Sequence, residues 1–102
     1  MIEVRQTDVY ENWFRKLRDR EAKSRILIRI KRLSAGNFGD VRQVGGGVSE
    51  LRIDYGPGYR VYFRRFDTEL VVLLLGGDKS SQRQDIERAR HLARDLVKGE
   101  SS

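Results

Sequence analysis

The sequence contains no cysteine, a single proline and a single histidine, and these shortages narrow what the protein can be. A chain without cysteine has no disulfides and no thiolate metal centre. One histidine, His91, leaves no histidine-rich metal cluster. The most apolar run covers residues 70–75, well short of the roughly 20 apolar residues that a membrane-spanning helix needs. We therefore expect no metal, no cofactor and no membrane span.

Charge, in contrast, is abundant: 35% of the residues are charged and the formal net charge is +6. Such a field attracts polyanions, so RNA, DNA and an acidic protein partner are all candidates. The first residues, MIEVRQ, do not resemble a signal peptide, and we expect a cytoplasmic protein. The length predicts one domain over residues 1–98, followed by a loose tail over residues 99–102.

The first part of the chain predicts a strand and two helices. Residues 2–5 alternate between apolar and polar, as in a half-buried strand. Thr7 or Asp8 then begins a helix with an apolar stripe of Tyr10, Trp13, Phe14 and Leu17. Residues 20–34 fit either a strand or a helix; their alanine, their Lys/Arg content and the glycine that follows favour the second arm of a helical hairpin. The glycine-rich residues 36–47 are interpreted as a connector.

The second part predicts three strands and a helix. Alternating residues at 50–55 and 59–64 flank the turn GPG, and the fully apolar strand 70–75 follows a turn at residues 67–68. Residues 82–98 place their apolar side chains roughly on one side of a helix. The predicted fold is therefore α+β: an N-terminal strand, a helical hairpin, a three-stranded antiparallel meander that completes a curved sheet, and a C-terminal helix.

The expected strand register predicts a cationic surface. Pairing of the two tyrosines that flank GPG sets Asp54 opposite Arg60 and Glu50 opposite Arg64. A two-residue turn between the next two strands sets Arg60 opposite Leu75. The side chains then expected on one surface are Arg52, Arg60, Tyr62, Arg64 and Lys79. Cross-strand ion pairing and a site for phosphates and stacked bases both remain open.

Two segments together resemble a known family. They are ELRIDYGPGYRVYF, residues 50–63, and VVLLLGGDKSSQRQDIERARHLA, residues 71–93. They are similar to the RelE/ParE superfamily of toxins from type II toxin–antitoxin systems, closest to the HigB-like, phage Gp49-like "addiction module killer protein" branch. The resemblance implies the same α+β fold and a toxin that poisons translation or replication. It implies three alternatives: a ribosome-dependent mRNA endonuclease, a ParE-like inhibitor of DNA gyrase, or an inactive module that only binds the antitoxin.

The resemblance also implies roles for individual residues. Arg60 matches an arginine that contacts the scissile phosphate, and Lys79 matches a lysine after the last strand. Asp78 matches an aspartate of HigB-type enzymes and also suits the cap of a turn. We therefore predict Arg60, Lys79 and Asp78 as catalytic residues. The predicted RNA- or phosphate-binding residues are Arg52, Tyr62 and Arg64.

Some positions depart from the family pattern. Asp54 stands where the RelE branch has a second lysine, Ser80 where it has an arginine, and Ile86 where it has a tyrosine. The glycines and serines that follow the apolar strand 70–75 are interpreted separately. Gly76 and Gly77 are expected to let the backbone approach a nucleic acid, and the serines at 80–81 to cap the helix.

The implied reaction is attack of a ribose 2′-OH on its own adjacent phosphate, which yields a 2′,3′-cyclic phosphate without a metal. Arg60 suits the developing charge, because a guanidinium stays protonated and binds phosphate with two donors. Lys79 suits proton transfer. The expected partners are the ribosome, mRNA and a cognate antitoxin that carries a helix-turn-helix. An acidic segment of that antitoxin is expected to recognise the cationic surface. Steric blocking of ribosome entry from the side of the helical hairpin, which is also basic, remains open as a second route.

Overall fold

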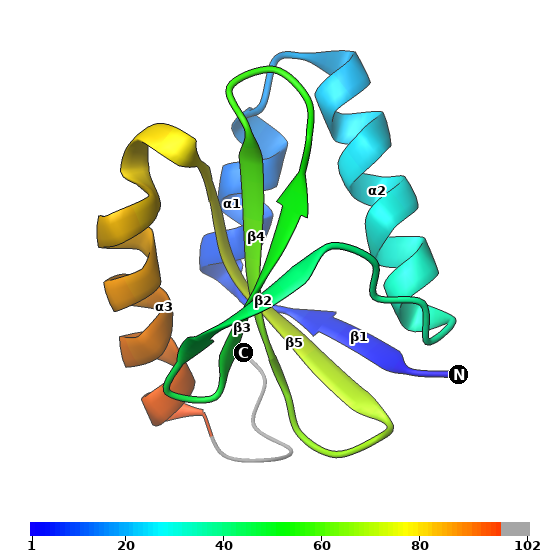
Figure 1. Ribbon diagram of the computed structural model, residues 1–102, viewed down its shortest axis with the longest axis vertical. Helices are drawn as coiled ribbons and strands as arrows, with labels where there is room; N and C mark the ends of the chain where they lie inside the picture. The colour runs from blue at the N-terminus through cyan, green and yellow to red at the C-terminus, as the bar shows by residue number, and fades with distance from the viewer. Residues whose placement is uncertain (97–102) are drawn as a thin grey trace.

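The computed structural model describes residues 1–96 and shows five strands and three helices (Figure 1). This confirms the predicted α+β class. In chain order the elements are β1 (Glu3–Gln6), α1 (Asp8–Lys16), α2 (Arg20–Ser34), β2 (Val41–Gly45), β3 (Val48–Ile53), β4 (Tyr59–Arg65), β5 (Leu70–Asp78), a short 3₁₀ helix η1 (Lys79–Ser81) and α3 (Gln82–Asp95). The predicted tail at 99–102 lies outside the described residues. No helix among residues 1–96 is long and apolar enough to cross a membrane.

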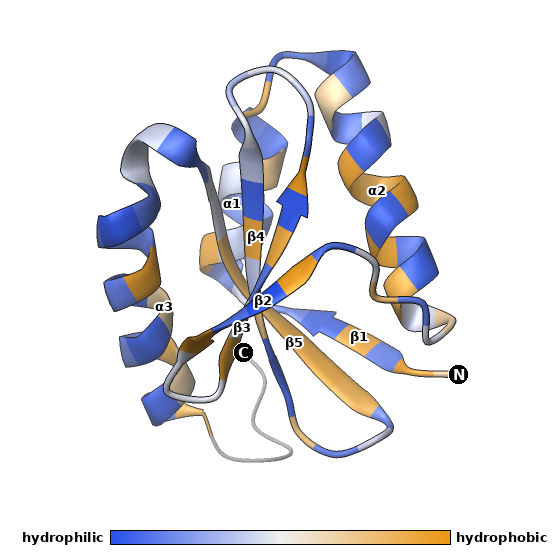
Figure 2. Ribbon diagram, viewed as in Figure 1, coloured by the Kyte–Doolittle hydropathy of each residue, from blue (hydrophilic) through white to orange (hydrophobic). Residues whose placement is uncertain are grey.

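The strands form one mixed sheet in the order β1-β5-β4-β3-β2. β5 pairs in parallel with β1 and antiparallel with β4, so it lies inside the sheet. Helices α1 and α2 cover one face and α3 covers the other (Figure 1). Because both faces are covered, β5 is apolar along most of its length, as Figure 2 shows. The sheet therefore separates two hydrophobic clusters.

Both arms of the predicted helical hairpin begin at side-chain caps. Thr7 Oγ1 accepts a hydrogen bond from the Tyr10 amide (3.1 Å) and donates one to the Leu74 carbonyl (2.6 Å), which ties the start of α1 to β5. Asp19 caps α2 by accepting from two backbone amides. The segment that fitted either a strand or a helix is helical, because Ala22, Ile26 and Leu33 recur on one buried face.

The interpretation of residues 36–47 as a connector is wrong in part, since they contain the edge strand β2. Val41 packs against the cluster beneath α1 and α2, and Val44 packs against the cluster beneath α3. The two valines are three residues apart, so the alternation of a strand places them on opposite faces. A bulge in the pairing with β3 follows between Gln43 and Gly45. At the other end of the chain, α3 stops at Asp95, before the predicted end at residue 98; residues 97–98 lie outside the described part.

The predicted register is wrong for both hairpins. The Gly58 amide donates to the Tyr55 carbonyl and closes a longer loop, so Ile53 pairs with Tyr59. As a result Arg60 lies opposite Arg52, and the expected facing of Asp54 with Arg60 does not occur. Between β4 and β5, a longer turn and a register shift after Tyr62 set Arg60 opposite Gly77. Sequence alternation alone cannot reveal either irregularity.

The two glycines after the apolar strand have a packing role that the sequence did not indicate. A Cβ atom at Gly76 would overlap the ring of Trp13 on α1, and one at Gly77 would overlap the carboxylate of Asp85 on α3. The space beside each glycine is therefore filled by the protein's own side chains. The expectation that these glycines admit a nucleic acid is replaced by close packing of α1 and α3 against β5.

Candidate functional site

A pocket of ≈ 450 Å³ lies where the β3–β4 loop meets the start of η1. Its neutral wall is formed by Ile53 and the GPG turn. The charged side chains that line it are Asp40, Arg52, Asp54, Arg60 and Lys79. Three of the predicted site residues, Arg52, Arg60 and Lys79, are thus brought together, and two carboxylates that were not predicted as site residues accompany them.

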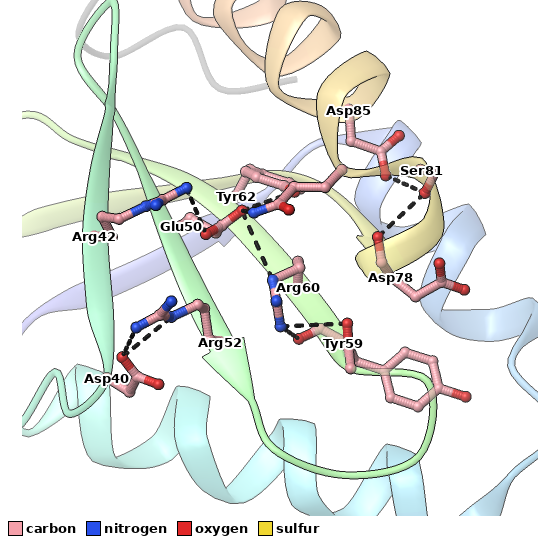
Figure 3. Close-up of polar contacts among 12 residues, drawn as sticks. Asp40, Arg42, Glu50, Arg52, Tyr59, Arg60, Tyr62, Asp78, Ser81 and Asp85 are labelled. Carbon is pink, nitrogen blue, oxygen red and sulfur yellow. Dashed lines mark hydrogen bonds and ion pairs between the residues drawn. The ribbon is translucent and has the colours of Figure 1, made fainter.

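Arg60 forms the floor of this pocket from the middle of the sheet. Its side chain is only 12% exposed. One terminal nitrogen, Nη1, lies 3.4 Å from the Gly58 carbonyl and 3.5 Å from the Tyr59 carbonyl (Figure 3). The other side of the guanidinium, at Nε, lies 3.8 Å from the buried carboxylate of Glu50. These contacts are long, so N–H donors of Arg60 are available to an anion in the pocket.

Lys79 reaches the same pocket from η1, directly after β5. It is exposed, and the GPG turn lies beside it. Gly58 has a φ of +82°, and a Cβ there would lie 3.4 Å from Lys79 Cβ and 3.5 Å from Arg60 Nη1. Those distances are ordinary contacts, so glycine is needed here for the left-handed backbone of the turn that lies next to the two cations.

Arg52 differs from the other two cations because it is already paired. Its guanidinium donates to Asp40 at 2.8 and 3.2 Å. This hydrogen bond is the main reason that the pKa of Asp40 lies below its ordinary value and that the pKa of Arg52 lies above its own. Arg29 of α2 holds the backbone of both residues, by donating to the carbonyls of Arg52 and Asp40. A phosphate must compete with Asp40 for Arg52.

Asp78 caps the helical turn that carries Lys79. Its Oδ1 atom accepts from both the backbone amide and the hydroxyl of Ser80. The interpretation of Asp78 as a cap is thereby confirmed. Ser81 occupies the N-cap position of α3 without a capping bond from its side chain, and donates to Asp85 instead (2.6 Å; Figure 3).

Two predicted binding residues are not at this surface. Tyr62 is fully buried among the residues beneath α3, and its hydroxyl donates to Glu50 (3.1 Å). Burial, followed by the charge of Glu50, raises the pKa of Tyr62 above its ordinary value. Arg64 lies farther along β4, where it donates to the Ala93 carbonyl in the last turn of α3 (2.7 Å) and covers the ring of Phe66. The predicted placement of Tyr62 and Arg64 on the cationic surface is wrong, because α3 covers that part of β4.

Glu50 is the residue that the sequence reasoning missed. Its side chain is fully buried on β3 and accepts hydrogen bonds from Tyr62 and from the Gln82 amide (2.8 Å). Two guanidinium groups lie 3.8 Å from its carboxylate, those of Arg42 and Arg60 (Figure 3). The sequence predicted that Glu50 lies on an exposed face of its strand and forms an ion pair with Arg64. In the structure α3 covers that face, and Glu50 is buried.

Other titratable groups lie outside the pocket. His91 is exposed on α3, where its ring contacts Arg94 (2.8 Å). Among residues 1–96 no group of three or more His, Asp or Glu side chains is arranged to hold a metal ion. What the pocket offers chemically is one exposed cation, Lys79, one largely buried cation, Arg60, a third cation that is paired with Asp40, and carboxylates that can accept a proton.

Comparison with known proteins shows the family to which the chain belongs. An uncharacterized protein of Haemophilus influenzae strain Rd is 50% identical over 95 residues, which cover 93% of this chain and 96% of that protein. Residues 12–98 match the family described as "Phage derived protein Gp49-like (DUF891)". That family comprises addiction-module, toxin-like proteins, which belong to toxin–antitoxin systems and have an antitoxin as partner. The match runs from the middle of α1 to the end of α3 and includes every residue of the pocket. The chain therefore belongs to the phage-derived Gp49-like family of addiction-module proteins.

Proposed function

We propose that this protein is a toxin of the RelE/ParE superfamily, in its HigB-like branch, and that it inhibits translation by cutting mRNA on the ribosome. The observation that carries the proposal is the convergence of Arg52, Arg60 and Lys79 on one open pocket. Phosphate is the group on RNA that such a cluster binds. The net charge of +6 adds a long-range attraction to ribosomal RNA and mRNA.

The reaction that suits the pocket is an intramolecular phosphoryl transfer within the RNA, from the 5′-oxygen to the 2′-oxygen. The ribose 2′-oxygen attacks the adjacent phosphorus, its proton passes to a base, and the bond from phosphorus to the 5′-oxygen breaks. Arg60 stabilises the negative charge of the pentavalent phosphorane, and Lys79 donates the proton to the leaving 5′-oxygen. No metal is needed, because the nucleophile belongs to the substrate and arginine supplies the positive charge.

Asp78 does not line the pocket itself but directly precedes Lys79, which does, and it is proposed as the base. Both of its capping bonds go to Oδ1, which leaves Oδ2 to accept the 2′-OH proton. Asp40 is a weaker base because Arg52 lowers its pKa. Asp78→Asn, which keeps a capping oxygen, is expected to slow cleavage, while Asp40→Asn is expected to preserve most of it.

The end groups of the RNA test this function most directly. Expression without the antitoxin is expected to arrest growth, and the cleaved mRNA is expected to carry 2′,3′-cyclic or 3′-phosphate ends. Mapping these ends by phosphatase-dependent ligation avoids the requirement of ribosomes for Mg²⁺. Products with 3′-hydroxyl ends contradict the mechanism. Intact mRNA together with loss of negative supercoiling would instead identify a gyrase inhibitor. Normal growth without either effect would identify an inactive module that only binds the antitoxin.

Variants of Lys79 separate proton transfer from charge neutralisation. Lys79→Ala is expected to reduce the cleavage rate roughly 10²- to 10⁴-fold if Lys79 is the general acid. Lys79→Arg keeps the charge but gives up a titratable proton, so it should restore only a small part of that loss. Single-turnover cleavage on programmed ribosomes measures both variants. Nearly complete rescue by arginine would assign Lys79 to charge neutralisation alone.

A further inference from the structure

The carboxylate of Glu50 is an unusual feature in the interior of this sheet. It is fully buried, on a strand that is covered by α3. A buried carboxylate is costly unless charges and hydrogen bonds compensate it. Tyr62 and Gln82 each donate one hydrogen bond to the same atom, Glu50 Oε2. The second oxygen, Oε1, has no hydrogen-bond partner among residues 1–96.

Arg60 carries the matching unsatisfied group. Its Nε atom is buried and has no hydrogen-bond partner within the described part of the chain. It lies 3.8 Å from Glu50 Oε2, which is an ion-pair distance but too long for a hydrogen bond. The oxygen nearest to Arg60 is thus the one that Tyr62 and Gln82 hold, while Oε1 lies 3.8 Å from Arg42. The Nε group of Arg60 therefore lies buried beside a negative charge that is fixed in place.

The two sides of the Arg60 guanidinium have different surroundings. The Nε side faces Glu50 in the interior, while Nη1 lies among the carbonyls of the turn that lines the pocket. Figure 3 shows Arg60 between Glu50 and the Tyr59 backbone. Because Tyr62 and Gln82 hold the carboxylate from β4 and α3, its position does not depend on solvent. A fixed charge behind a guanidinium fixes the direction of its outer donors.

We propose that Glu50 is a positioning residue, which acts through Arg60 to aim its outer N–H groups at a phosphate in the pocket. The inference rests on the proposed function for its substrate, a phosphodiester of RNA. Tyr62 and Gln82 hold the carboxylate of Glu50 in place through their hydrogen bonds. Glu50 does not touch the substrate, since it has no exposed surface.

The test compares two glutamates that carry the same charge. Glu50→Gln keeps the shape of the side chain and removes its charge. Glu69→Gln removes the same charge from an exposed turn and serves as the control. Each change makes the protein more positive, which by itself favours RNA binding. Glu50→Gln is nevertheless expected to lower the cleavage rate by up to about 10²-fold, the cost of a misdirected catalytic group, while Glu69→Gln keeps the wild-type rate.

A readout that a purely structural role would not change is the Nε–H resonance of Arg60. It is identified as the arginine Nε–H signal that disappears in Arg60→Lys. Glu50→Gln is expected to shift this signal and to speed its hydrogen exchange at least tenfold, with the backbone amide spectrum otherwise preserved. If Glu50→Gln unfolds, Tyr62→Phe carries the test. It removes one hydrogen bond to Glu50 and should move the same signal in the same direction by less.

The outcomes separate this inference from the proposed function. Wild-type protein that does not cut mRNA overturns the proposed function, yet the Arg60 signal still reports on Glu50. An Arg60 signal that Glu50→Gln leaves unchanged in a folded protein overturns the positioning role, whatever the activity. Equal losses of cleavage by Glu50→Gln in wild-type and Arg60→Lys backgrounds would also overturn it, because a residue that acts through Arg60 must show a non-additive effect.

Discussion

Cells that express the Arg60→Ala variant without antitoxin are expected to grow as well as cells with an empty vector. Arg60 is the cation that lies in the floor of the pocket, where its Nη1 atom lies among the carbonyls of the β3–β4 turn. Loss of one such group commonly lowers a catalysed rate roughly 10²- to 10³-fold. Colony counts after induction and the rate of mRNA cleavage on purified ribosomes measure the effect.

The control for this variant is Arg42→Ala. Arg42 lies at the same 3.8 Å distance from Glu50 as Arg60 does, but it does not line the pocket. Its loss is expected to leave toxicity unchanged. Because Arg60→Ala also leaves Glu50 without its buried neighbour, Arg60→Lys is needed as a variant that keeps the charge and loses the forked donors. Full toxicity of a folded Arg60→Lys or Arg60→Ala protein would remove Arg60 from the site.

Gly76→Ala is expected to destabilise the fold by about 1–3 kcal/mol, the usual cost of forcing an extra carbon into a packed core. The backbone at Gly76 is ordinary, so the effect is steric and comes from the Trp13 ring, which a Cβ would overlap. In a domain of this size the melting temperature should fall by roughly 4–8 °C per kcal/mol. Thermal unfolding followed by circular dichroism measures it.

Two further variants show whether Trp13 is the cause. In a Trp13→Leu background, Gly76→Ala should cost much less, because the smaller side chain leaves room for the methyl group. Gly77→Ala should also be milder, since the atom in its way is the end of the Asp85 side chain, which can rotate. Equal destabilisation by Gly76→Ala with and without Trp13 would contradict the packing explanation.

The order of elements in this fold is largely readable from the sequence. Apolar alternation, the Thr7 cap and the apolar run at residues 70–75 are local signals, and each one corresponds to an observed element. The edge strand β2 escapes prediction, because five residues with two partly buried valines lie within a glycine-rich segment. Local pattern therefore identifies the elements that carry a strong hydrophobic signal and misses the weak edge.

The site is only partly predictable, because it depends on register and on what covers each face. Arg60 and Lys79 meet in the structure although the predicted register was wrong, since both lie at the same end of the sheet. Tyr62 and Glu50 looked like surface residues because they alternate with core positions. In fact both faces of β4 are covered at that point, one by α2 and one by α3. Which face a helix covers is a property of the whole chain.

The parallel pairing of β1 with β5 has a consequence for the folding of the nascent chain. Thr7 and Leu74 are bonded across 67 residues, so neither β1 nor α1 has its partner until β5 has been synthesised. Lys79 follows β5 directly, so the pocket cannot assemble before residue 79 has been added to the chain. A nascent chain stopped before residue 70 lacks β5, which pairs with both β1 and β4, and it also lacks Lys79. Such a truncated product carries Arg60 without Lys79, and the proposed site is absent from it.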